Sequence, residues 1–475
     1  MRKTQMVCDM KIRSFIIVCL LSWGCALWAQ EHPDSVEPPH IWRALGELGI
    51  VNGTIHAVNR FVMNESYAKT NLHSIGTNLT SGFTWDSDNF QLNQLGHPCQ
   101  GTLFYNAARS NGMNFWQSLP FALAGSLVWE MMGENEPPSI NDLITTTVAG
   151  AAMGETAHRL AARIIREHEQ GPRRFFREVS AALIDPVGGI TRLLTGRAWK
   201  VKSGQGNTAS EAEDDSDAPR LMVGARYLAV TDESQTAHPH PFFAFTMDYG
   251  QAADGERHDT PYDFFSAEAA LTFGKGQPLV SHIQVTGRLC SMPIVDSKKV
   301  FGDFGLYQYF AYDDSRLPDD SAKPSPFPYG EMASVGPGVA FVFPRLTSSL
   351  TAEQRFFAKG VALGASKSDY YKMGDRDYIF GSGYGAAMMS RLTWQRVGLL
   401  QLDANYLHLF TWNNRLGDNS NTRLFNIGLK TRVGISRLFS LMMGASLISR
   451  HSYYHQYSPH RVFCYELKAA LQYAL

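Results

Sequence analysis

The chain has 475 residues, of which 18% are charged and 12% are aromatic, and its formal net charge at pH 7 is −1. A balanced charge without a dense basic tract gives no support to nucleic-acid binding, so we expect no nucleic-acid partner. Charged residues average about 25% in soluble proteins, so this composition points away from an ordinary soluble domain.

Residues 1–29 have the features of a secretory signal peptide. Lys11 and Arg13 form a positive segment, the apolar run FIIVCLL follows, and Ala29 is a suitable cleavage point. The apolar run is too short to span a bilayer, which takes about 20 residues. We therefore expect the chain to be exported by its N-terminus.

Cleavage after residue 29 would leave three cysteines, which are Cys99, Cys290 and Cys464. An odd number of widely spaced cysteines does not indicate a disulfide framework. The sequence also lacks a CxxC pair and the paired-histidine spacing of HExxH. From these motifs we expect no cofactor and no metal.

Residues 30–199 are predicted to form a helical domain that contains a hairpin of helices rich in small residues. Its central stretch reads PPSINDLITTTVAGAAMGETAHRL. We expect a helix from Ile140 to about Glu167, with Ser139 as N-cap and Asp142 as the carboxylate of a capping box. Small or polar residues then recur at every fourth position on one side of this helix: Thr146, Gly150, Gly154 and His158. They form a groove in which a second helix can lie close.

The expected partner in that groove is the preceding helix, NFWQSLPFALAGSLVWE, which also carries small residues. At about fifteen residues this helix is too short to cross a membrane. A third helix, GTLFYNAARSNG, is expected to end at Gly112, because glycine favours the position after a helix. It carries Asn106 and Arg109.

Charged side chains of this domain form the candidate catalytic group: Glu130, Asp142, Glu155, His158, His97 and Arg109. Carboxylates and a histidine on facing helices can perform acid–base chemistry or bind a cation. The alternative is structural, with Glu130 or Glu155 paired to Arg109 or Arg159 so that the helices are locked together. His97, in the segment LNQLGHPCQG, is expected in a loop, either as a general base or as an anchor. No GxSxG motif is present for a nucleophilic serine.

Residues 200–219 are predicted to be an acidic, flexible linker. The segment KVKSGQGNTASEAEDDSDAP is rich in Gly, Ser, Asp and Glu and has no apolar periodicity. Such a composition favours a solvated and mobile chain.

From residue 220 to residue 475, apolar and polar side chains alternate, which is the pattern of β-strands. One example is the alternation of Phe425, Ile427 and Leu429 with Asn426, Gly428 and Lys430. About twelve such segments occur, and several exceed ten residues, which suits tilted membrane strands of about 9–11 residues. Aromatic residues near segment ends, such as Trp394, Trp412 and Tyr473, resemble interfacial girdles.

These patterns predict an α+β protein, with the helical domain followed by an antiparallel transmembrane β-barrel of about twelve strands. A secreted all-β domain is the alternative. In the barrel, one set of charged residues would face the lumen: Glu268, Arg288, Asp403, Lys430, Arg432 and Lys468. They are expected to form a salt-bridge network, and a pore lining is the functional alternative.

Four segments carry a family resemblance: HPCQGTLFYNAARSNGMNFWQS, GSLVWEMMGENEPPSINDLITTTVAGAAMGE, GYGAAMMSRL and DANYLHLFTW. Together they resemble the domain of unknown function 3943 family of Gram-negative envelope proteins. The resemblance implies an envelope location and no established activity. Cys99 stands where the family pattern has an aromatic residue, so no role of that side chain is carried over.

The sequence thus predicts an outer-membrane protein of Gram-negative type, with a helical domain that is periplasmic or plugs the barrel. Its expected partners are outer-membrane lipid and the barrel-assembly machinery, and no small-molecule or lipid ligand is identified. The first functional hypothesis is an envelope channel or scaffold. The alternative is an outer-membrane enzyme that acts on lipid or glycan through the carboxylate and histidine cluster.

Overall fold

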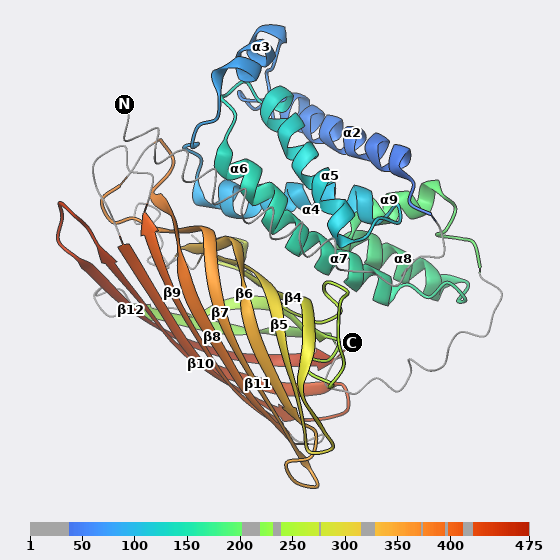
Figure 1. Cartoon of the computed structure of the whole chain (residues 1–475), viewed down its shortest axis with the longest axis vertical. Helices are drawn as coiled ribbons and strands as arrows, with labels where there is room; N and C mark the ends of the chain where they lie inside the picture. The colour runs from blue at the N-terminus through green and yellow to red at the C-terminus, as the bar shows by residue number, and fades with distance from the viewer. Residues whose placement is uncertain are drawn as a thin grey trace.

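The computed structural model describes residues 38–201, 219–230, 239–274, 277–314, 328–371, 374–394, 398–411 and 421–474. The predicted signal peptide, most of the predicted linker, and Trp412 lie outside the described residues. The chain folds into a helical domain and a β-barrel (Figure 1).

The α-helices are α2 (Ile41–Ala57), α3 (Leu72–Ser81), α4 (His97–Arg109), α5 (Phe115–Val128), α6 (Ile140–Ile144), α7 (Gly150–Ile164), α8 (Pro172–Ile184) and α9 (Pro186–Leu194). Single π-helical turns extend several of them, and these are η1 (Val58–Val62), η2 (Leu92–Gly96), η3 (Trp129–Gly133) and η4 (Thr145–Ala149). None of the described helices has both the length and the apolar character needed to cross a membrane.

The strands are β1 (Arg220–Val230), β2 (Pro239–Tyr249), β3 (Phe265–Thr272), β4 (Val280–Ser297), β5 (Val300–Asp313), β6 (Tyr329–Phe343), β7 (Leu350–Lys367), β8 (Tyr378–Trp394), β9 (Gly398–Thr411), β10 (Asn421–Gly434), β11 (Phe439–Tyr453) and β12 (His460–Ala474). Each strand pairs antiparallel with its sequence neighbours, and β1 pairs with β12 so that the barrel closes. The predicted fold class is therefore confirmed. Closure leaves no unpaired strand edge.

The two faces of the barrel differ in chemistry. On β10, Lys430 points inward and contacts Glu268 of β3, which lies several strands away around the barrel. Its neighbour Leu429 points outward and is exposed. Because successive side chains of a strand point to opposite faces, these two residues determine which neighbouring side chains point inward and which point outward.

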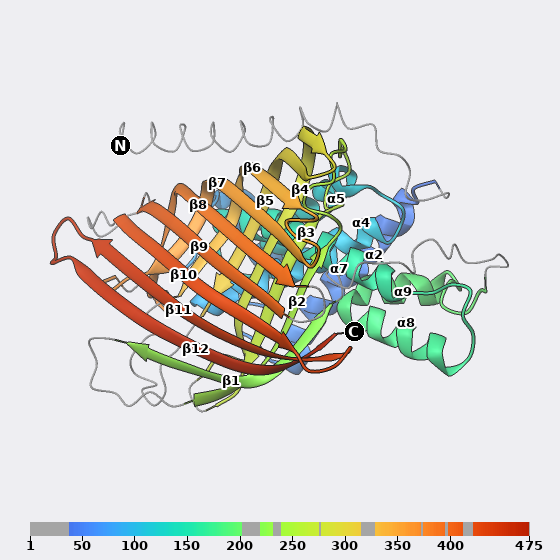
Figure 2. The ribbon, with the colours of Figure 1, turned by 90° about the horizontal axis from the view of Figure 1, so that it is seen from below.

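The helical domain lies against the outer wall of the barrel (Figures 1 and 2). Its residues Phe90, Tyr105 and Ala152 belong to one apolar cluster with Val285 of β4 and Phe310 of β5. On β4 to β8, most of the outward side chains in this cluster lie toward the same end of the barrel: Val285, Phe310, Ala333, Leu363 and Phe380. The described helices therefore cover the wall from outside, which differs from the expected alternative of a plug in the lumen.

The small-residue groove of α7 is present, but its partner differs from the prediction. A Cβ atom at Gly150 would lie 2.6 Å from the backbone of Gly101 on α4, and one at Gly101 would lie 1.8 Å from the carbonyl oxygen of Thr146. The close neighbour is therefore α4, whereas the sequence analysis expected the preceding helix, α5. Glycine faces glycine on α4 and α7, and this pair brings the two backbones together.

The helix that begins at Ile140 ends at Ile164, three residues before the expected Glu167, and includes the π-helical turn η4. The predicted capping box is absent, since the Ser139 side chain makes no capping hydrogen bond. Instead, the Ser139 backbone N–H donates to Glu130 Oε2 at 2.6 Å. A carboxylate from η3 thus takes the place that Asp142 was expected to fill.

Candidate functional site

Acidic residues from separate segments meet at the N-terminal end of α6. Residues 84–88 approach this end because Thr84 pairs with the extended segment before α6. The Thr84 N–H donates to the Pro138 carbonyl at 2.8 Å, and the Ile140 N–H donates to the Thr84 carbonyl at 2.9 Å. Pro138 favours the extended conformation that this pairing needs.

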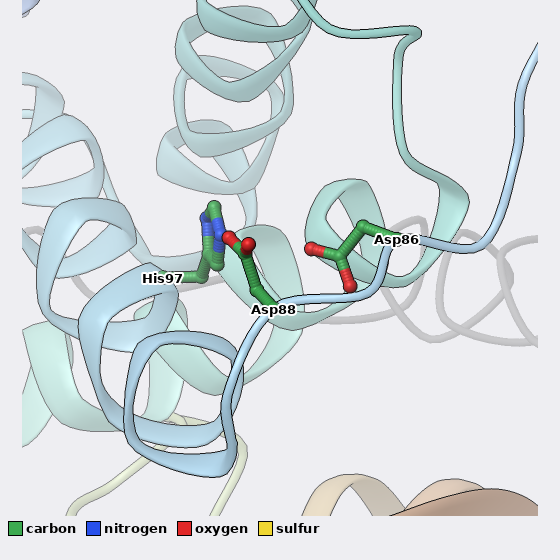
Figure 3. A group of neighbouring side chains, drawn as sticks. All are labelled: Asp86, Asp88 and His97. Carbon is green, nitrogen blue, oxygen red and sulfur yellow. The ribbon is translucent and has the colours of Figure 1, made fainter. Parts of the chain in front are cut away.

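His97 stands at the centre of the resulting group. Ligand atoms of Asp86, Asp88 and His97 lie within 4.8 Å of one another, as do those of His97, Glu130 and Asp142 (Figure 3 shows the first three). His97 Nε2 lies 3.4 Å from Asp142 Oδ1. His97, Glu130 and Asp142 are 5%, 1% and 2% exposed, so this half of the group is excluded from water. We call these five residues the acidic cluster.

The acidic cluster is tied to the barrel through amide side chains. Asn93 donates to Asp86 Oδ1 at 2.7 Å and to the hydroxyl of Tyr378 on β8 at 2.6 Å. Asn141 donates to Asn93 Oδ1 at 3.1 Å and to Asp142 Oδ1 at 2.7 Å. The guanidinium of Arg376 donates to the Asp86 carbonyl at 2.6 Å. The cluster therefore lies where the helical domain meets the start of β8.

Burial disfavours charge on these carboxylates. It raises the pKa of Asp86 to about 8, with a further contribution from the neighbouring Asp142. Burial likewise raises the pKa of Asp88 to about 6 and that of the nearby Glu134 to about 7. The pKa values of Glu130 and Asp142 are raised well above their usual range, again mainly by burial. In the described part of the chain, none of these carboxylates forms an ion pair with a lysine or an arginine.

Glu155 belongs to a different group. Its Oε2 lies 2.7 Å from Arg109 Nε, its Oε1 lies 2.8 Å from Arg159 Nε, and the Tyr105 hydroxyl donates to it at 2.8 Å. Burial alone would raise the pKa of Glu155, but Arg109 and Arg159 outweigh that effect and lower it to about 2. Arg159 also donates to the Pro261 carbonyl of the barrel at 2.7 Å. This group joins α4, α7 and the barrel.

The six candidate residues from the sequence therefore fall into three places. Glu130, Asp142 and His97 meet in the acidic cluster, and Glu155 pairs with Arg109. His158 Nδ1 lies 3.3 Å from Asp185 Oδ2, outside the acidic cluster, and His158 contributes with the arginines to the lowered pKa of Glu155. His97 was expected in a loop, but it begins α4, because the preceding turn η2 is already helical, and its side chain is buried.

Sequence reasoning missed Asp86, Asp88 and Glu134. Asp86 and Asp88 lie in the loop TWDSDNF before a helix, where acidic residues are common and indicate nothing specific. The pairing of Thr84 with the segment before α6 and the hydrogen bond from the Asp86 N–H to Asn141 Oδ1 at 3.2 Å bring them to Glu130 and Asp142. Glu134 directly follows η3, where the Trp129 indole N–H donates to its carboxylate and the Asn78 amide donates to its carbonyl.

The inward charges of the barrel form ion pairs. Lys430 Nζ lies 2.8 Å from Glu268 Oε2 and 3.8 Å from Asp403 Oδ2. Lys468 Nζ lies 3.1 Å from Glu466 Oε2, and Arg432 follows Lys430 by two residues on the same face of β10. Arg288 is buried beside Asp263, with Nε 2.8 Å from Oδ1.

Further ion pairs cross the lumen. Asp248 of β2 bonds with Arg391 of β8, and these strands are six positions apart in both directions around the twelve strands. Arg355 Nη2 of β7 also lies 3.3 Å from Asp248 Oδ2. Residues 250–264, between β2 and β3, add an apolar layer in which Phe264 packs with Tyr307. Opposite walls of the barrel thus touch through side chains.

The structure defines a class of protein, a closed twelve-stranded antiparallel barrel with a helical domain on its outer wall. Residues 82–187 match the family model described as "Domain of unknown function (DUF3943)", which confirms the resemblance over the segment that holds the whole acidic cluster. A search of curated proteins finds no match.

Solved structures similar to this chain include porins and a transporter. The NanC porin is 9% identical, with a TM-score of 0.27, and the match covers 53% of this chain and 100% of that one. The KdgM porin is 8% identical, with a TM-score of 0.23 and coverages of 54% and 99%. The Pseudomonas putida toluene transporter TodX is 9% identical, with a TM-score of 0.21 and coverages of 57% and 94%.

Proposed function

We propose that the protein is an outer-membrane scaffold, whose closed barrel anchors the helical domain at the envelope and does not conduct in its resting form. Export through residues 1–29 and insertion by the barrel-assembly machinery belong to the same proposal. The closed barrel supports the location, because a sheet without edges satisfies its backbone hydrogen bonds in lipid.

The outer wall supplies the lipid-facing surface. On the strands that the helices do not cover, the outward side chains include Leu429, Leu467 and Leu471, which are exposed by 48%, 55% and 48%. β4 and β7 each have 18 residues, whereas a membrane-crossing strand needs about 9–11. Strands of this length can cross the lipid with one part and contact the helical domain with the other.

The contact between Asp248 and Arg391 is the observation that carries the scaffold role. It joins opposite walls of the barrel, and Arg355 reinforces it from β7. Separating a buried ion pair leaves each charge without its partner, which strongly destabilises a protein. This cost is expected to keep the two walls in contact. A solute passage would need these side chains to part.

Conductance in planar bilayers tests the proposal. The full chain is expected to show no steady current, and the double variant Asp248→Ala, Arg391→Ala is expected to pass more current than wild type, because the ion pair across the lumen is removed while the layer around Phe264 stays. Arg173→Ala changes an exposed residue of α8 and is the matched control, expected to stay silent. A steady current from the wild-type chain would overturn the scaffold role and establish the channel hypothesis.

Cell fractionation tests the location. The protein is expected in the outer-membrane fraction and to run differently on gels before and after heating, as closed barrels do. Recovery in the soluble periplasm without detergent would contradict the proposal. The six candidate residues of the enzyme alternative do not converge on one site, because Glu155, Arg109 and His158 lie outside the cluster of His97, Glu130 and Asp142.

A further inference from the structure

The acidic cluster combines a high density of carboxylates with very little positive charge. Its four carboxylates and one imidazole come from the loop before the first turn of the α4 helix, from α4 itself, from η3 and from α6. In the described part of the chain, their one ion pair joins His97 and Asp142. An isolated buried carboxylate costs several kcal/mol, so folding this group without a cation is unfavourable.

Two atoms of the cluster have no hydrogen-bond partner in the described structure, although both residues are more than nine-tenths buried. These atoms are Glu130 Oε1 and His97 Nδ1. Native structures satisfy the large majority of buried polar atoms, so an unpartnered carboxylate oxygen and an unpartnered ring nitrogen in the same cluster indicate a missing ligand. Both atoms have lone pairs to offer when the histidine is neutral at that nitrogen.

The surroundings hold the donors in place. Asn93 and Asn141 fix Asp86 and Asp142 by hydrogen bonds, and the Ser139 N–H fixes the other oxygen of Glu130. In known metal sites, hydrogen bonds from residues that do not touch the metal orient the side chains that do. The amides are neutral, so they position the carboxylates without cancelling their charge.

We propose that His97, Glu130 and Asp142, together with Asp86 and Asp88, bind one divalent metal ion at the junction between the helical domain and β8. The donor set selects the ion. Carboxylate oxygens suit Mg²⁺, Ca²⁺ and Mn²⁺, whereas an imidazole favours transition metals. A set with several carboxylates and one imidazole fits Mn²⁺ or Zn²⁺. This inference goes beyond the scaffold role and does not depend on whether the barrel conducts.

The expectation of no metal rested on the motifs CxxC and HExxH, whose ligands stand at fixed short spacings. Here the donors span residues 86–142 and meet through tertiary contacts, which no spacing motif describes. The cluster lies at the docking contact itself, since Arg376 donates to the Asp86 carbonyl and the Tyr378 hydroxyl donates to the Asp88 carbonyl. A bound ion would stabilise this junction.

The first experiment uses Mn²⁺ as the probe. The full chain in detergent is treated with a chelator, dialysed against Mn²⁺, and measured by elemental analysis and by electron spin-echo spectroscopy. We expect saturable binding of one ion per chain with nitrogen modulation from the His97 imidazole. His97→Gln should abolish the nitrogen modulation. Absence of saturable binding, or nitrogen modulation that persists in His97→Gln, would overturn the proposal.

Calorimetric titration of variants assigns the carboxylates. Asp142→Asn and Glu130→Gln should each weaken Mn²⁺ binding by about tenfold or more, and Zn²⁺ should behave in the same way. The matched control is Glu47→Gln, which alters a buried carboxylate of α2 that bonds to Asn111 and Thr191 outside the cluster. Protease resistance of each variant checks folding, and the wild-type spectrum decides the question if a variant fails to fold. Equal affinity in the double variant Asp142→Asn, Glu130→Gln would mean surface binding and would overturn the site.

Discussion

α4 carries a buried acidic group at each end, and the two groups are built in opposite ways. At its C-terminal end, Arg109 joins Arg159 around Glu155, and the carboxylate has a pKa near 2. At its N-terminal end, His97 meets Asp142 and Glu130, whose pKa values are raised by burial. Arginines of the chain compensate the negative charge of the first group, whereas the carboxylates of the second group need protons or an external cation.

This difference separates a structural role from a binding role more clearly than residue type does. Both groups contain buried glutamates on helices, and the spacing of these residues in the sequence does not distinguish the two groups. The presence of facing arginines decides between a structural role and a binding role, because a buried charge must be compensated wherever it lies. The following variants test whether the two ends of α4 differ as described.

The largest effect is expected from Arg109→Met, which keeps the length of the side chain and removes its charge. Glu155 would remain buried with one cation less, so we expect a loss of about 3–5 kcal/mol in the free energy of unfolding. Urea unfolding of the full chain in detergent, followed by protease sensitivity of the helical domain, measures it. Arg173→Met on the exposed side of α8 is the control and should stay within about 0.5 kcal/mol. A loss below about 1 kcal/mol in Arg109→Met would show that Glu155 needs no compensation.

The second prediction concerns pH. The pKa of Glu155 is lowered from 4.5 to about 2 in the folded state, so its stabilisation is fully present above pH 4.5 and is lost as the pH falls through 2. A shift of this size corresponds to roughly 3 kcal/mol. The unfolding free energy of wild type minus that of Glu155→Gln should therefore fall by about 3 kcal/mol between pH 6 and pH 2. A difference that does not change with pH would contradict the ion-pair account.

Much of the fold was predictable because it depends on local periodicity. Alternation around Leu429 and Lys430 gave the strands and their facing, and the pairing of Glu155 with Arg109 was one of the two stated alternatives. The position of the helical domain was not predictable, because outward residues such as Phe310 and Tyr312 read as lipid-facing whether helices or lipid cover them. The acidic cluster was only partly predictable, since Asp86 and Asp88 reach it through one backbone pairing at Thr84.

The third prediction tests the contact that holds both ends of α4 in place. Gly150→Ala would place a Cβ atom 2.6 Å from the Gly101 backbone, which cannot move away as a flexible side chain would. We expect a loss of about 1–3 kcal/mol and weaker Mn²⁺ binding, because a displaced α4 moves His97 as well as Arg109. Gly53→Ala on α2 is the matched control, since nothing lies within 4 Å of the added atom there. It should stabilise the protein by up to about 1 kcal/mol. Equal behaviour of the two variants would contradict the close α4–α7 contact.

The smallest effect is expected from Glu130→Gln measured in the presence of a chelator. Glutamine keeps the shape of the side chain, and its amide oxygen can still accept the hydrogen bond from the Ser139 N–H. The substitution removes a buried acidic group that no lysine or arginine pairs with, so stability should change by less than about 1 kcal/mol or should rise. When Mn²⁺ is added, wild type should gain thermal stability and Glu130→Gln should gain little, because only wild type has the full ligand set. Glu155→Gln, the same chemical change at the other end of α4, should lose stability in the chelator and keep its response to Mn²⁺. If Glu130→Gln instead loses more than about 2 kcal/mol in the chelator, the charge of Glu130 already serves the fold and the two ends of α4 are alike.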